Sequence, residues 1–255
     1  MKTRIHLVRH GLSESNLDVS VNRRKPDHAI DLADEGRQQA AEAGHRMAMA
    51  IQASRAQAPS ESSSGFVHSR VRLLISPYAR TRQTAEGITG ALDSAGIHYS
   101  TKEELAIREQ SFGLFDGLSP EELKDMYPKE YAHYDKHSNF EGEFFAPMPM
   151  GESRARVSDR VRTCFGSILR DMSGRDSPPV TDMIIVSHGV TIRCFRLAFM
   201  HRPWEWCERK PNPANCSILT IEGETGRGWK EYQTFEGFPH PGHTLQKLRE
   251  EGHVG

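Results

Sequence analysis

The sequence predicts an α/β fold: a three-layer sandwich with a mostly parallel central sheet, helices on both faces and an inserted lid segment. Short apolar runs alternate with longer helix-forming segments along the chain, which is the pattern of a sheet wound with helices. In addition, three apolar runs stop abruptly at polar residues, namely at Arg9, Ser76 and Ser187. Because ligands bind at the carboxyl ends of the strands in such sheets, we expect one site there, built from distant parts of the chain.

Strands are expected where short apolar runs lie between polar or turn-forming residues. The runs RIHLV and DMIIVS have the pattern of buried strands, and TKEELAI is expected to carry a short edge strand. The last two strands of the chain are expected to pair with each other. In chain order, the expected strands cover residues 4–8, 71–76, 101–107, 182–187, 216–223 and 229–235.

Helices are expected in the longer segments rich in Ala, Gln, Met and charged residues. Asp34 or one of its neighbours should cap the first helix, and the second helix should end at Gly96. The polar, Ser-rich stretch 55–69 breaks the pattern between them and is expected to be a mobile loop. The expected helices cover residues 32–54, 79–96, 119–127, 151–173 and 190–200.

Residues 112–150 differ from the rest of the chain in their many aromatic residues, charges and prolines. Ser119 and Glu122 have the spacing of a capping box, which predicts a short helix. We interpret 112–150 as a lid inserted into a single domain of residues 1–255, and 239–255 as a flexible tail. The aromatic side chains could line a site for an organic leaving group or form a small core of the lid itself.

The composition limits the classes of function. A length of 255 residues with 36% hydrophobic and 26% charged residues is ordinary for a globular protein. The formal net charge of −1 gives no global attraction to nucleic acid or acidic membranes, so neither is expected as a partner and anion binding must be local. No apolar stretch approaches the ~20 residues that cross a bilayer, and the N-terminal run is too short for a secretory signal. We therefore expect a cytoplasmic protein.

The cysteines show no spacing that is typical of a zinc ribbon, because CxxC pairs are absent from the sequence. A disulfide framework is not expected at this size and cysteine density. The cysteines are expected to be reduced, mostly buried thiols at positions 164, 194, 207 and 216.

His10 is the first candidate for chemistry. A lone histidine is usually a packed or surface residue, but here Gly11 follows it and permits a sharp turn. The preceding residue, Arg9, suits a pair of phosphate oxygens and would oppose a metal cation. An ordinary imidazole, with a pKa of about 6.5, is largely neutral at neutral pH and can act as a nucleophile. The pattern favours phosphate chemistry over a metal site.

Phosphoryl transfer needs further groups. Negative charge spreads over the phosphoryl oxygens, so cationic and N–H donors are required, and Arg9, Arg80 and His188 could supply them. A carboxyl group must protonate the leaving oxygen. The best candidate is Glu109, with competition from three other carboxylates: Glu103, Glu104 and Asp116.

At these residues the sequence resembles the histidine phosphatase superfamily, whose fold is that of the phosphoglycerate mutases. The first motif is LVRHGLSESN at residues 7–16. The remaining motifs follow in the order of the family and span nearly the whole chain: LADEGRQQA (32–40), SPYARTRQTA (76–85), REQSFGLFDG (108–117), GESRARVSDRV (151–161), VSHGVTIR (186–193) and NCSI (215–218). A single Arg-His-Gly would be weak evidence, whereas this ordered set is specific.

The resemblance implies a role for each matching residue. His10 would become phosphorylated, His188 would be the second histidine of the site, and Glu109 would be the proton donor. The phosphoryl group would be bound by Arg9, Asn16, Arg80 and the backbone N–H of Gly189. No metal or other cofactor is implied, and the expected partner is a small phosphorylated substrate.

The resemblance leaves three activities open: hydrolysis of a phosphomonoester, mutase transfer, and phospho-ligand binding without catalysis. The segment 112–150 lacks the basic, tyrosine-bearing pattern of the cofactor-dependent mutases, and GES followed by VSDRV resembles phosphatase branches. Intact motif positions argue against a silent binding protein. We therefore expect hydrolysis, with phosphoglycerate mutase and a binding protein as alternatives.

Other polar residues have simpler interpretations. The basic run of Arg23, Arg24 and Lys25 is either a solvated loop or a rim that faces the substrate. Arg82 is expected at the surface because it lies two helical positions beyond Arg80. His6 is expected to be packed within its strand. The pair His240 and His243 resembles a weak metal tract but is more typical of a flexible tail.

Overall fold

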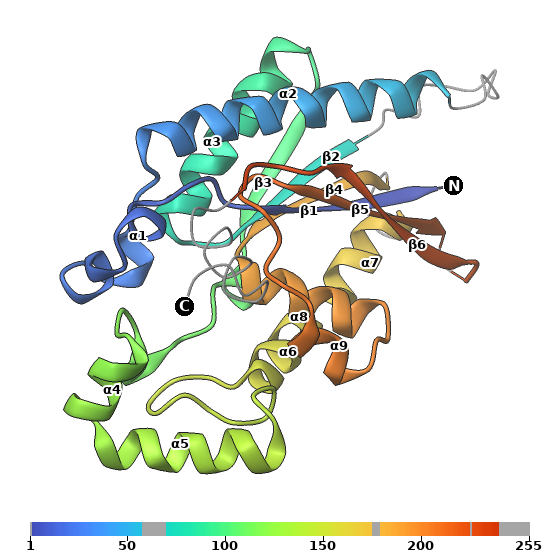
Figure 1. The fold of residues 1–255 in the computed structure, drawn as a ribbon. Helices are drawn as coiled ribbons and strands as arrows, with labels where there is room; N and C mark the ends of the chain where they lie inside the picture. The colour runs from blue at the N-terminus through green and yellow to red at the C-terminus, as the bar shows by residue number, and fades with distance from the viewer. Residues whose placement is uncertain (1, 58–69, 175–178, 225, 240–255) are drawn as a thin grey trace.

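The fold is described from a computed structural model, which defines residues 2–57, 70–174, 179–224 and 226–239. In these ranges one six-stranded sheet has the order β3-β2-β4-β1-β5-β6 (Figure 1). The first four of these strands are parallel, whereas β5 is antiparallel to β1 and β6 is antiparallel to β5. The strands are β1 (Thr3–Arg9), β2 (Arg70–Ile75), β3 (Tyr99–Glu103), β4 (Val180–Ser187), β5 (Ile218–Glu224) and β6 (Gly228–Phe235). The prediction of a mostly parallel sheet is confirmed.

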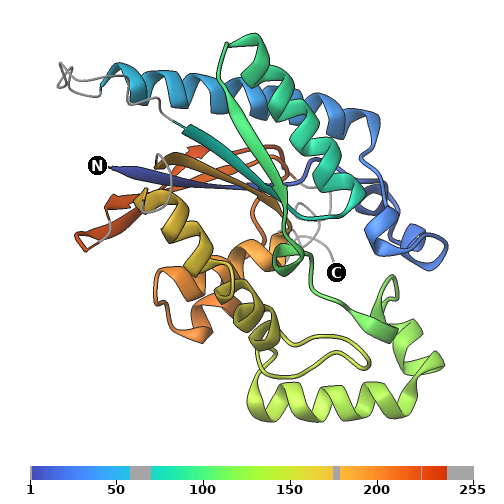
Figure 2. The same ribbon diagram turned by 180° about the vertical axis from the view of Figure 1, so that it is seen from behind.

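Helices cover both faces of the sheet, as predicted. The long helices α2 (Asp34–Ala56) and α3 (Ala79–Ser94) lie side by side on one face (Figures 1 and 2). The opposite face carries α6 (Arg154–Arg162), α7 (Phe165–Ser173), α8 (Gly189–Phe199) and α9 (Trp204–Arg209). Short helical turns follow β1: α1 (Glu14–Leu17), η1 (Val19–Arg23) and η2 (Asp27–Ala29). None of the helices in the described ranges is long and apolar enough to span a membrane.

The core consists of two apolar layers, one on each side of the sheet. The central strand β4 divides its side chains between them, with Met183 and Ile185 on the α8 side and Ile184 and Val186 on the α2–α3 side. All four are buried, because helices cover both faces of this strand. A strand buried on both faces has a continuous apolar sequence rather than an alternating one, which is why it could be predicted.

The segment 112–150 lies away from the sheet, beyond α6 (Figure 1). Its first helix, α4 (Pro120–Met126), has the predicted capping box: Glu122 N donates to Ser119 Oγ at 3.3 Å, and Ser119 N donates to Glu122 Oε2 at 2.9 Å. Its second helix, α5 (Pro128–Glu141), was not predicted. None of the residues of α5, all of which are described, is buried, so the helix lacks the strong apolar periodicity that would have predicted it.

Several boundaries differ from the prediction. Residues 151–173 form two helices rather than one, because Thr163 N and Cys164 N bond to carbonyls three residues back and tighten the chain there. The edge strand β3 begins at Tyr99, and the 3₁₀ turn η3 (Leu105–Ile107) replaces the end of the predicted strand. The N-cap of α2 is Ala33, which has no capping side chain.

Two further predictions have different outcomes. The cysteines at positions 164, 194, 207 and 216 are free and buried, as predicted. The Ser-rich loop and the C-terminal tail lie almost entirely outside the described residues.

Candidate active site

The register of two parallel strands brings the two motif histidines together. Arg9, the last residue of β1, lies opposite Ser187, the last residue of β4. The next residue on each strand is a histidine, and His10 N donates to the Ser187 carbonyl at 3.0 Å. The imidazole rings of His10 and His188 meet edge to face, with centroids 5.3 Å apart. The sheet topology therefore places both histidines at one edge, as predicted.

The ring of His10 is oriented by its own main chain. Its Nδ1 lies 2.8 Å from the carbonyl oxygen of Gly11. A carbonyl oxygen can only accept, so Nδ1 must carry the proton. In a neutral ring the lone pair is then at Nε2, which is the arrangement that a nucleophilic imidazole requires.

His188 is fully buried, and its Nε2 lies 2.7 Å from Ser76 Oγ, at the end of β2. Its Nδ1 has no hydrogen-bond partner among the described residues. Burial, followed by the charge of Arg80, lowers the pKa of His188 well below its usual value. The side chain is therefore neutral in this pocket and has one ring nitrogen available to a ligand.

Arg9 is buried and is held by a hydrogen bond from its Nη1 to the Pro213 carbonyl at 2.6 Å. Its Nε has no partner among the described residues. Burial lowers the pKa of Arg9 to about 10, and the charge of Arg80 acts in the same direction, whereas Glu109 opposes it. The guanidinium still remains cationic at neutral pH. A buried cation with an unsatisfied donor is suited to an anion.

Arg80 lies in the first turn of α3 and is also buried. Its Nη1 donates to the Asp27 carbonyl at 2.6 Å and lies 2.8 Å from Asp27 Oδ1. The guanidinium lies over the ring of Tyr78, 5.1 Å from the centroid, and that ring in turn contacts His188 at 5.0 Å. Aromatic and acidic neighbours thus fix the direction of this arginine.

Asn16 is oriented by two donors. Its Oδ1 accepts from Ser13 N at 3.2 Å and from Asn215 Nδ2 at 3.2 Å. Because Ser13 N is a backbone donor, the oxygen of the Asn16 amide must face it, which leaves the NH₂ group as the donor for a ligand. Asn215 Nδ2 also donates to the His10 carbonyl at 3.1 Å.

The glycines beside the two histidines are required by protein packing. A Cβ at Gly11 would lie 2.5 Å from the carbonyl oxygen of Gly36 in α2. A Cβ at Gly189 would lie 2.7 Å from Cγ of Asn212. Both glycines therefore let the loops after β1 and β4 pack closely against neighbouring segments. Gly189 is also the first residue of α8, where backbone N–H groups have no partner within the helix.

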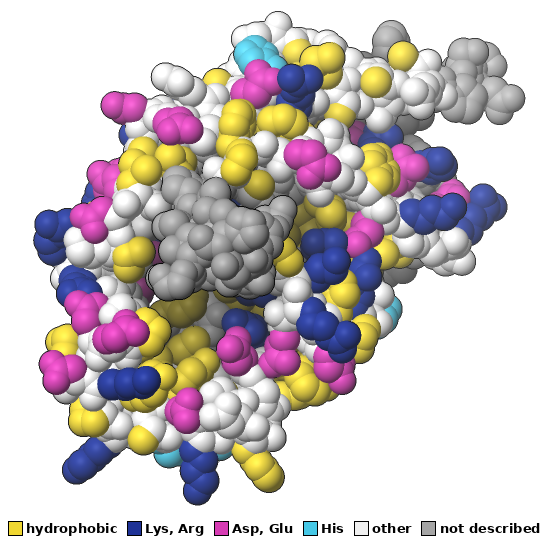
Figure 3. Space-filling view, in the orientation of Figure 1, with side chains coloured by type: hydrophobic (Ala, Val, Ile, Leu, Met, Phe, Trp, Pro, Cys, Tyr) yellow, Lys and Arg dark blue, Asp and Glu magenta, His cyan; other side chains and the backbone are white. Residues whose placement is uncertain are grey.

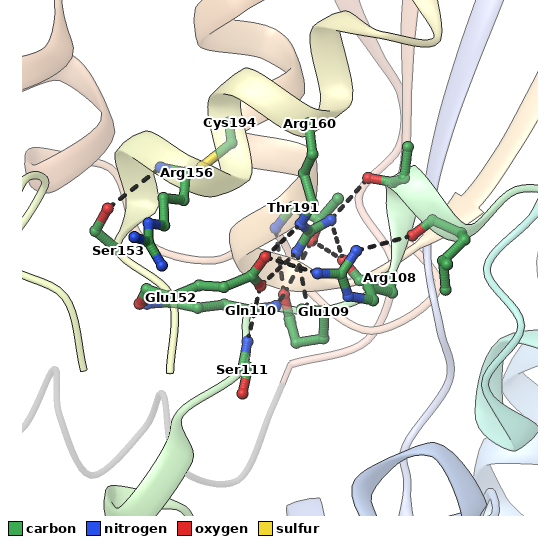
Figure 4. Close-up of polar contacts among 12 residues, drawn as sticks. Arg108, Glu109, Gln110, Ser111, Glu152, Ser153, Arg156, Arg160, Thr191 and Cys194 are labelled. Atoms are coloured by element: carbon green, nitrogen blue, oxygen red, sulfur yellow. Dashed lines mark hydrogen bonds and ion pairs between the residues drawn. The ribbon is translucent and has the colours of Figure 1, made fainter. Parts of the chain in front are cut away.

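Glu109 lies after η3, and its carboxyl group faces the start of α8. Oε1 accepts from Gln110 N at 3.0 Å and from Thr191 N at 3.3 Å, and Thr191 Oγ1 lies 3.2 Å away (Figure 4). Glu109 is also near Arg9, and the negative charge of Glu109 raises the pKa of Arg9 against the effect of burial. The structure thus brings the predicted proton donor to the same edge of the sheet.

The other candidate acids have different partners. Glu103 forms an exposed ion pair with Arg82, with Arg82 Nε 2.6 Å from Glu103 Oε1. Glu104 Oε1 accepts from Ala106 N at 3.1 Å, and Asp116 Oδ1 accepts from Asn22 Nδ2 at 2.5 Å. Arg82 is thus at the surface, as predicted.

His6 is buried, as predicted, with Nδ1 2.9 Å from Thr220 Oγ1 and Nε2 3.1 Å from Asp182 Oδ1. The pair His240 and His243 lies outside the described residues. In the described part of the chain no three His, Cys, Asp or Glu side chains gather as metal ligands.

The basic run is already paired with carboxylates. Arg23 Nε donates to the Gly117 carbonyl at 2.8 Å and its Nη2 lies 2.6 Å from Glu122, so it joins η1 to the lid. Arg24 Nη2 lies 3.1 Å from Asp18, and Lys25 Nζ lies 2.9 Å from Glu14. Charges of both signs are intermingled on the face shown in Figure 3. A substrate-facing rim at these residues stays a prediction.

Sequence reasoning assigned no role to several residues that fix the candidate groups. One of them, Asp27, lies two residues after the basic run of Arg23, Arg24 and Lys25. Four others lie within motifs that carry the family resemblance: Glu152, Arg160, Thr191 and Asn215. Their place in these motifs is the one feature of the sequence that could have indicated a role. Some of the lid aromatics pack together, since the Phe115 ring contacts those of Tyr131 and Tyr134 at 6.3 and 5.4 Å, whereas Phe144 is buried in the main core on the α8 side of the sheet.

Comparisons with known proteins agree with this geometry. The family model described as "Histidine phosphatase superfamily (branch 1)" matches residues 5–234. The phosphoglycerate mutase-like protein AT74 of Arabidopsis thaliana is 37% identical over 86% of this chain, and the match covers 64% of its own length. The broad-range acid phosphatase DET1 of Saccharomyces cerevisiae is 25% identical over 86% of this chain and 84% of its own.

The fold is also found among solved structures. A mycobacterial glucosyl-3-phosphoglycerate phosphatase superposes with a TM-score of 0.61 at 17% identity, over 91% of this chain and 98% of its own. At this identity the likeness concerns the fold alone. Together with the family model, which covers most of the sequence, these matches lead to one assignment: this chain belongs to branch 1 of the histidine phosphatase superfamily.

Proposed function

We propose that the protein is a phosphomonoester hydrolase that transfers the phosphoryl group of a small phosphorylated metabolite first to His10 and then to water. The observation that carries the proposal is the meeting of His10 and His188 beside two buried arginines. Two buried donors of this pocket, Arg9 Nε and His188 Nδ1, have no partner among the described residues. A bound phosphate would satisfy such donors, since buried polar groups are almost always hydrogen-bonded.

In the first step, Nε2 of His10 attacks phosphorus. The Nε2–P bond forms as the bond from phosphorus to the ester oxygen breaks. The fixed donors Arg9, Arg80 and Asn16 stabilise the charge on the phosphoryl oxygens, and the N–H groups at the start of α8 act in the same way. A protonated Glu109 gives its proton to the leaving oxygen, which departs as an alcohol.

In the second step, the carboxylate of Glu109 accepts a proton from water, and the water oxygen attacks phosphorus. The Nε2–P bond breaks, inorganic phosphate leaves, and both His10 and Glu109 return to their starting protonation states. His188 stays neutral throughout the resting state because its pKa lies well below the usual value. In the tautomer that carries its proton on Nδ1, His188 donates a hydrogen bond to a phosphoryl oxygen, while its Nε2 accepts from Ser76 Oγ.

The lid segment 112–150 is proposed to cover the leaving group. Figure 3 shows a hollow lined largely by hydrophobic side chains above α4 and α5. An apolar wall of this kind suits an organic leaving group better than a second phosphate. The name of DET1, an acid phosphatase, supports hydrolysis.

A mutase is the second candidate, because AT74 is named a phosphoglycerate mutase-like protein. The two activities differ in whether water or a second substrate hydroxyl receives the phosphoryl group from His10. Phosphate release from the metabolite separates them directly.

The test is release of inorganic phosphate from p-nitrophenyl phosphate and from a panel that includes 3-phosphoglycerate and fructose 2,6-bisphosphate, with excess chelator present. We expect release from the aryl ester and a clear ranking among the metabolites. Interconversion of phosphoglycerates after addition of bisphosphoglycerate, without phosphate release, would identify a mutase. Absence of both phosphate release and interconversion with every substrate would favour a binding protein. Loss of activity with chelator would indicate a metal-dependent enzyme.

A further inference from the structure

The main chain that carries Glu109 is held by the side chain of Arg160 in α6. This segment follows η3 and forms no helix or strand of its own. Arg160 Nη1 donates to the carbonyls of Ala106 at 2.7 Å and Arg108 at 2.8 Å, and its Nη2 donates to the Glu109 carbonyl at 2.9 Å (Figure 4). One guanidinium thus fixes three carbonyls within four consecutive residues.

Arg160 is itself fixed by Glu152, the residue that follows the lid and Gly151. The two groups form a bidentate pair, with Nε 2.9 Å from Oε1 and Nη2 3.1 Å from Oε2. Both side chains are only 13% exposed. Burial raises the pKa of Glu152, but the hydrogen bond and charge of Arg160, together with Ser111 N and the charge of Arg108, bring the pKa below its usual value. The pair is therefore ionised, and its planar fork defines the direction of the guanidinium.

Glu152 also joins the two ends of the lid beside this segment. Its Oε2 accepts from Ser111 N at 3.1 Å, and its own N donates to the Ser111 carbonyl at 2.8 Å. Gln110 Nε2 donates to the Glu152 carbonyl at 2.8 Å, and Arg108 Nη2 lies 2.8 Å from Glu152 Oε1. Every residue from 108 to 111 is thus bonded to Glu152 or Arg160.

The opposite side of the segment is held by α8. Thr191 Oγ1 donates to the Arg108 carbonyl at 2.6 Å, and Thr191 N donates to Glu109 Oε1 at 3.3 Å. The carboxyl group therefore lies between two supports: the Glu152–Arg160 pair, which fixes its main chain, and Thr191, which contacts its oxygen. Neither Glu152 nor Arg160 contacts the Glu109 carboxyl itself through the hydrogen bonds found here.

We propose that Glu152 and Arg160 are positioning residues that hold Glu109 where it can protonate the leaving oxygen. This inference rests on the proposed phosphohydrolase activity. A general acid must lie within about 2.6–3.2 Å of the atom that it protonates, and an error of about 1 Å can cost ~10²-fold in rate. Because the segment has no backbone ladder, its position depends on these side chains.

The test compares an alkyl phosphate, 2-glycerophosphate, with p-nitrophenyl phosphate in the full-length enzyme. An alkoxide needs protonation to leave, whereas p-nitrophenolate needs little. We expect Glu152→Gln and Arg160→Lys to lower kcat/KM, which reports the first phosphoryl transfer alone, ~10–100-fold more for the alkyl ester than for the aryl ester. Glu109→Gln should show the same selectivity to a larger degree. The double variant Glu109→Gln/Glu152→Gln should be no more selective than Glu109→Gln, because both changes remove one function.

The chain offers a matched control in the pair of Arg196 and Glu231, with Nη2 2.9 Å from Oε1 and Nε 3.3 Å from Oε2. These side chains are 17% and 16% exposed, close to the values for the positioning pair. Glu231→Gln should leave the ratio of alkyl to aryl rates at the wild-type value. The ratio does not depend on how much protein folds, so it remains valid for a destabilised variant. Should Glu152→Gln give no folded protein, Arg160→Lys and Thr191→Val are measured in the same way.

The outcomes separate the two proposals. An active wild type with equal slowing of both esters by Glu152→Gln and Arg160→Lys would overturn the positioning role alone, as would the same selectivity in Glu231→Gln. A wild type that releases phosphate from neither ester would overturn the proposed function, and the positioning role would fall with it.

Discussion

Arg80 is bound by Asp27 through both the main chain and the side chain, at 2.6 Å to the carbonyl oxygen and 2.8 Å to the carboxylate. Asp27 lies in η2, far from α3 in sequence. It orients the buried guanidinium of Arg80 before any substrate binds. Fixed charges stabilise a transition state without reorganising, which is what distinguishes them from surface charges of the same sign.

Replacement of Arg80 with Gln should lower kcat/KM for p-nitrophenyl phosphate by ~10²–10³-fold, because one fixed donor to the phosphoryl oxygens is lost. Steady-state kinetics provide the measurement. Arg82→Gln is the control, since Arg82 lies two residues further along α3 and its side chain forms an exposed pair with Glu103. An equal loss in both variants would show that Arg80 acts through the stability of α3 rather than through the phosphate.

His10→Ala should reduce turnover below ~1% of wild type, because no covalent intermediate can form. The wild type, quenched during turnover of ³²P-labelled substrate, should retain an acid-labile label that the variant lacks. Replacement of His133, an exposed histidine on α5, should leave both label and turnover unchanged. Turnover by His10→Ala above that level would contradict the assignment of the nucleophile.

His188 should make stability depend on pH. Its pKa is lowered by burial in the folded protein but is about 6.5 in the unfolded chain. Between these values the unfolded chain binds more protons, so the unfolding free energy falls as the pH drops below about 6.5, by at most about 1.4 kcal/mol per pH unit. Above that pH the contribution is fully present.

His188→Asn removes this titration, so the difference in unfolding free energy between wild type and variant should shrink as the pH is lowered from about 7 to about 5. Urea denaturation in phosphate-free buffer is the appropriate measurement, because a bound anion would favour the protonated ring. A difference that stays constant over this range would mean that His188 titrates equally in both states.

Asp182→Asn should lower the unfolding free energy by about 3–5 kcal/mol, because it removes the buried carboxylate that accepts two hydrogen bonds from the partly buried Arg4 and leaves only the more distant Glu222 beside the guanidinium among the described residues. In the wild type Asp182 Oδ1 lies 2.7 Å from Arg4 Nε and 3.1 Å from His6 Nε2. Glu103→Gln, which breaks the exposed pair with Arg82, should cost less than about 1 kcal/mol. Similar midpoints of urea denaturation for the two variants would refute the distinction.

The sequence was most informative where burial and local pattern agree. The apolar run of β4 and the capping box at Ser119 could be predicted because each depends on neighbouring residues. In contrast, α5 has no buried residue, so its sequence lacks the apolar periodicity that indicates a helix and its bounds. The break between α6 and α7 falls at Thr163 and Cys164, whereas the nearby Gly166 lies inside α7 and does not mark it.

In the candidate site, too, only the features that follow from local sequence pattern and strand order could be predicted. His10 and His188 could be placed together because parallel strands bring their carboxyl ends to one edge. The contact between Asp27 and Arg80 depends on how η2 packs against α3, which no local pattern encodes. In the same way, the support of Glu109 by Arg160 joins residues about 50 positions apart and becomes visible only in the folded chain.

The neighbours of β1 have a consequence for the order in which the site is assembled. β1 is synthesised before both strands that flank it, since it pairs with β4 at residues 180–187 and with β5 at residues 218–224. His10, which follows β1, therefore lacks both neighbouring strands until the ribosome has passed these residues. Nascent chains that end before β5 cannot complete the sheet around His10, and such long-range pairing makes folding slow.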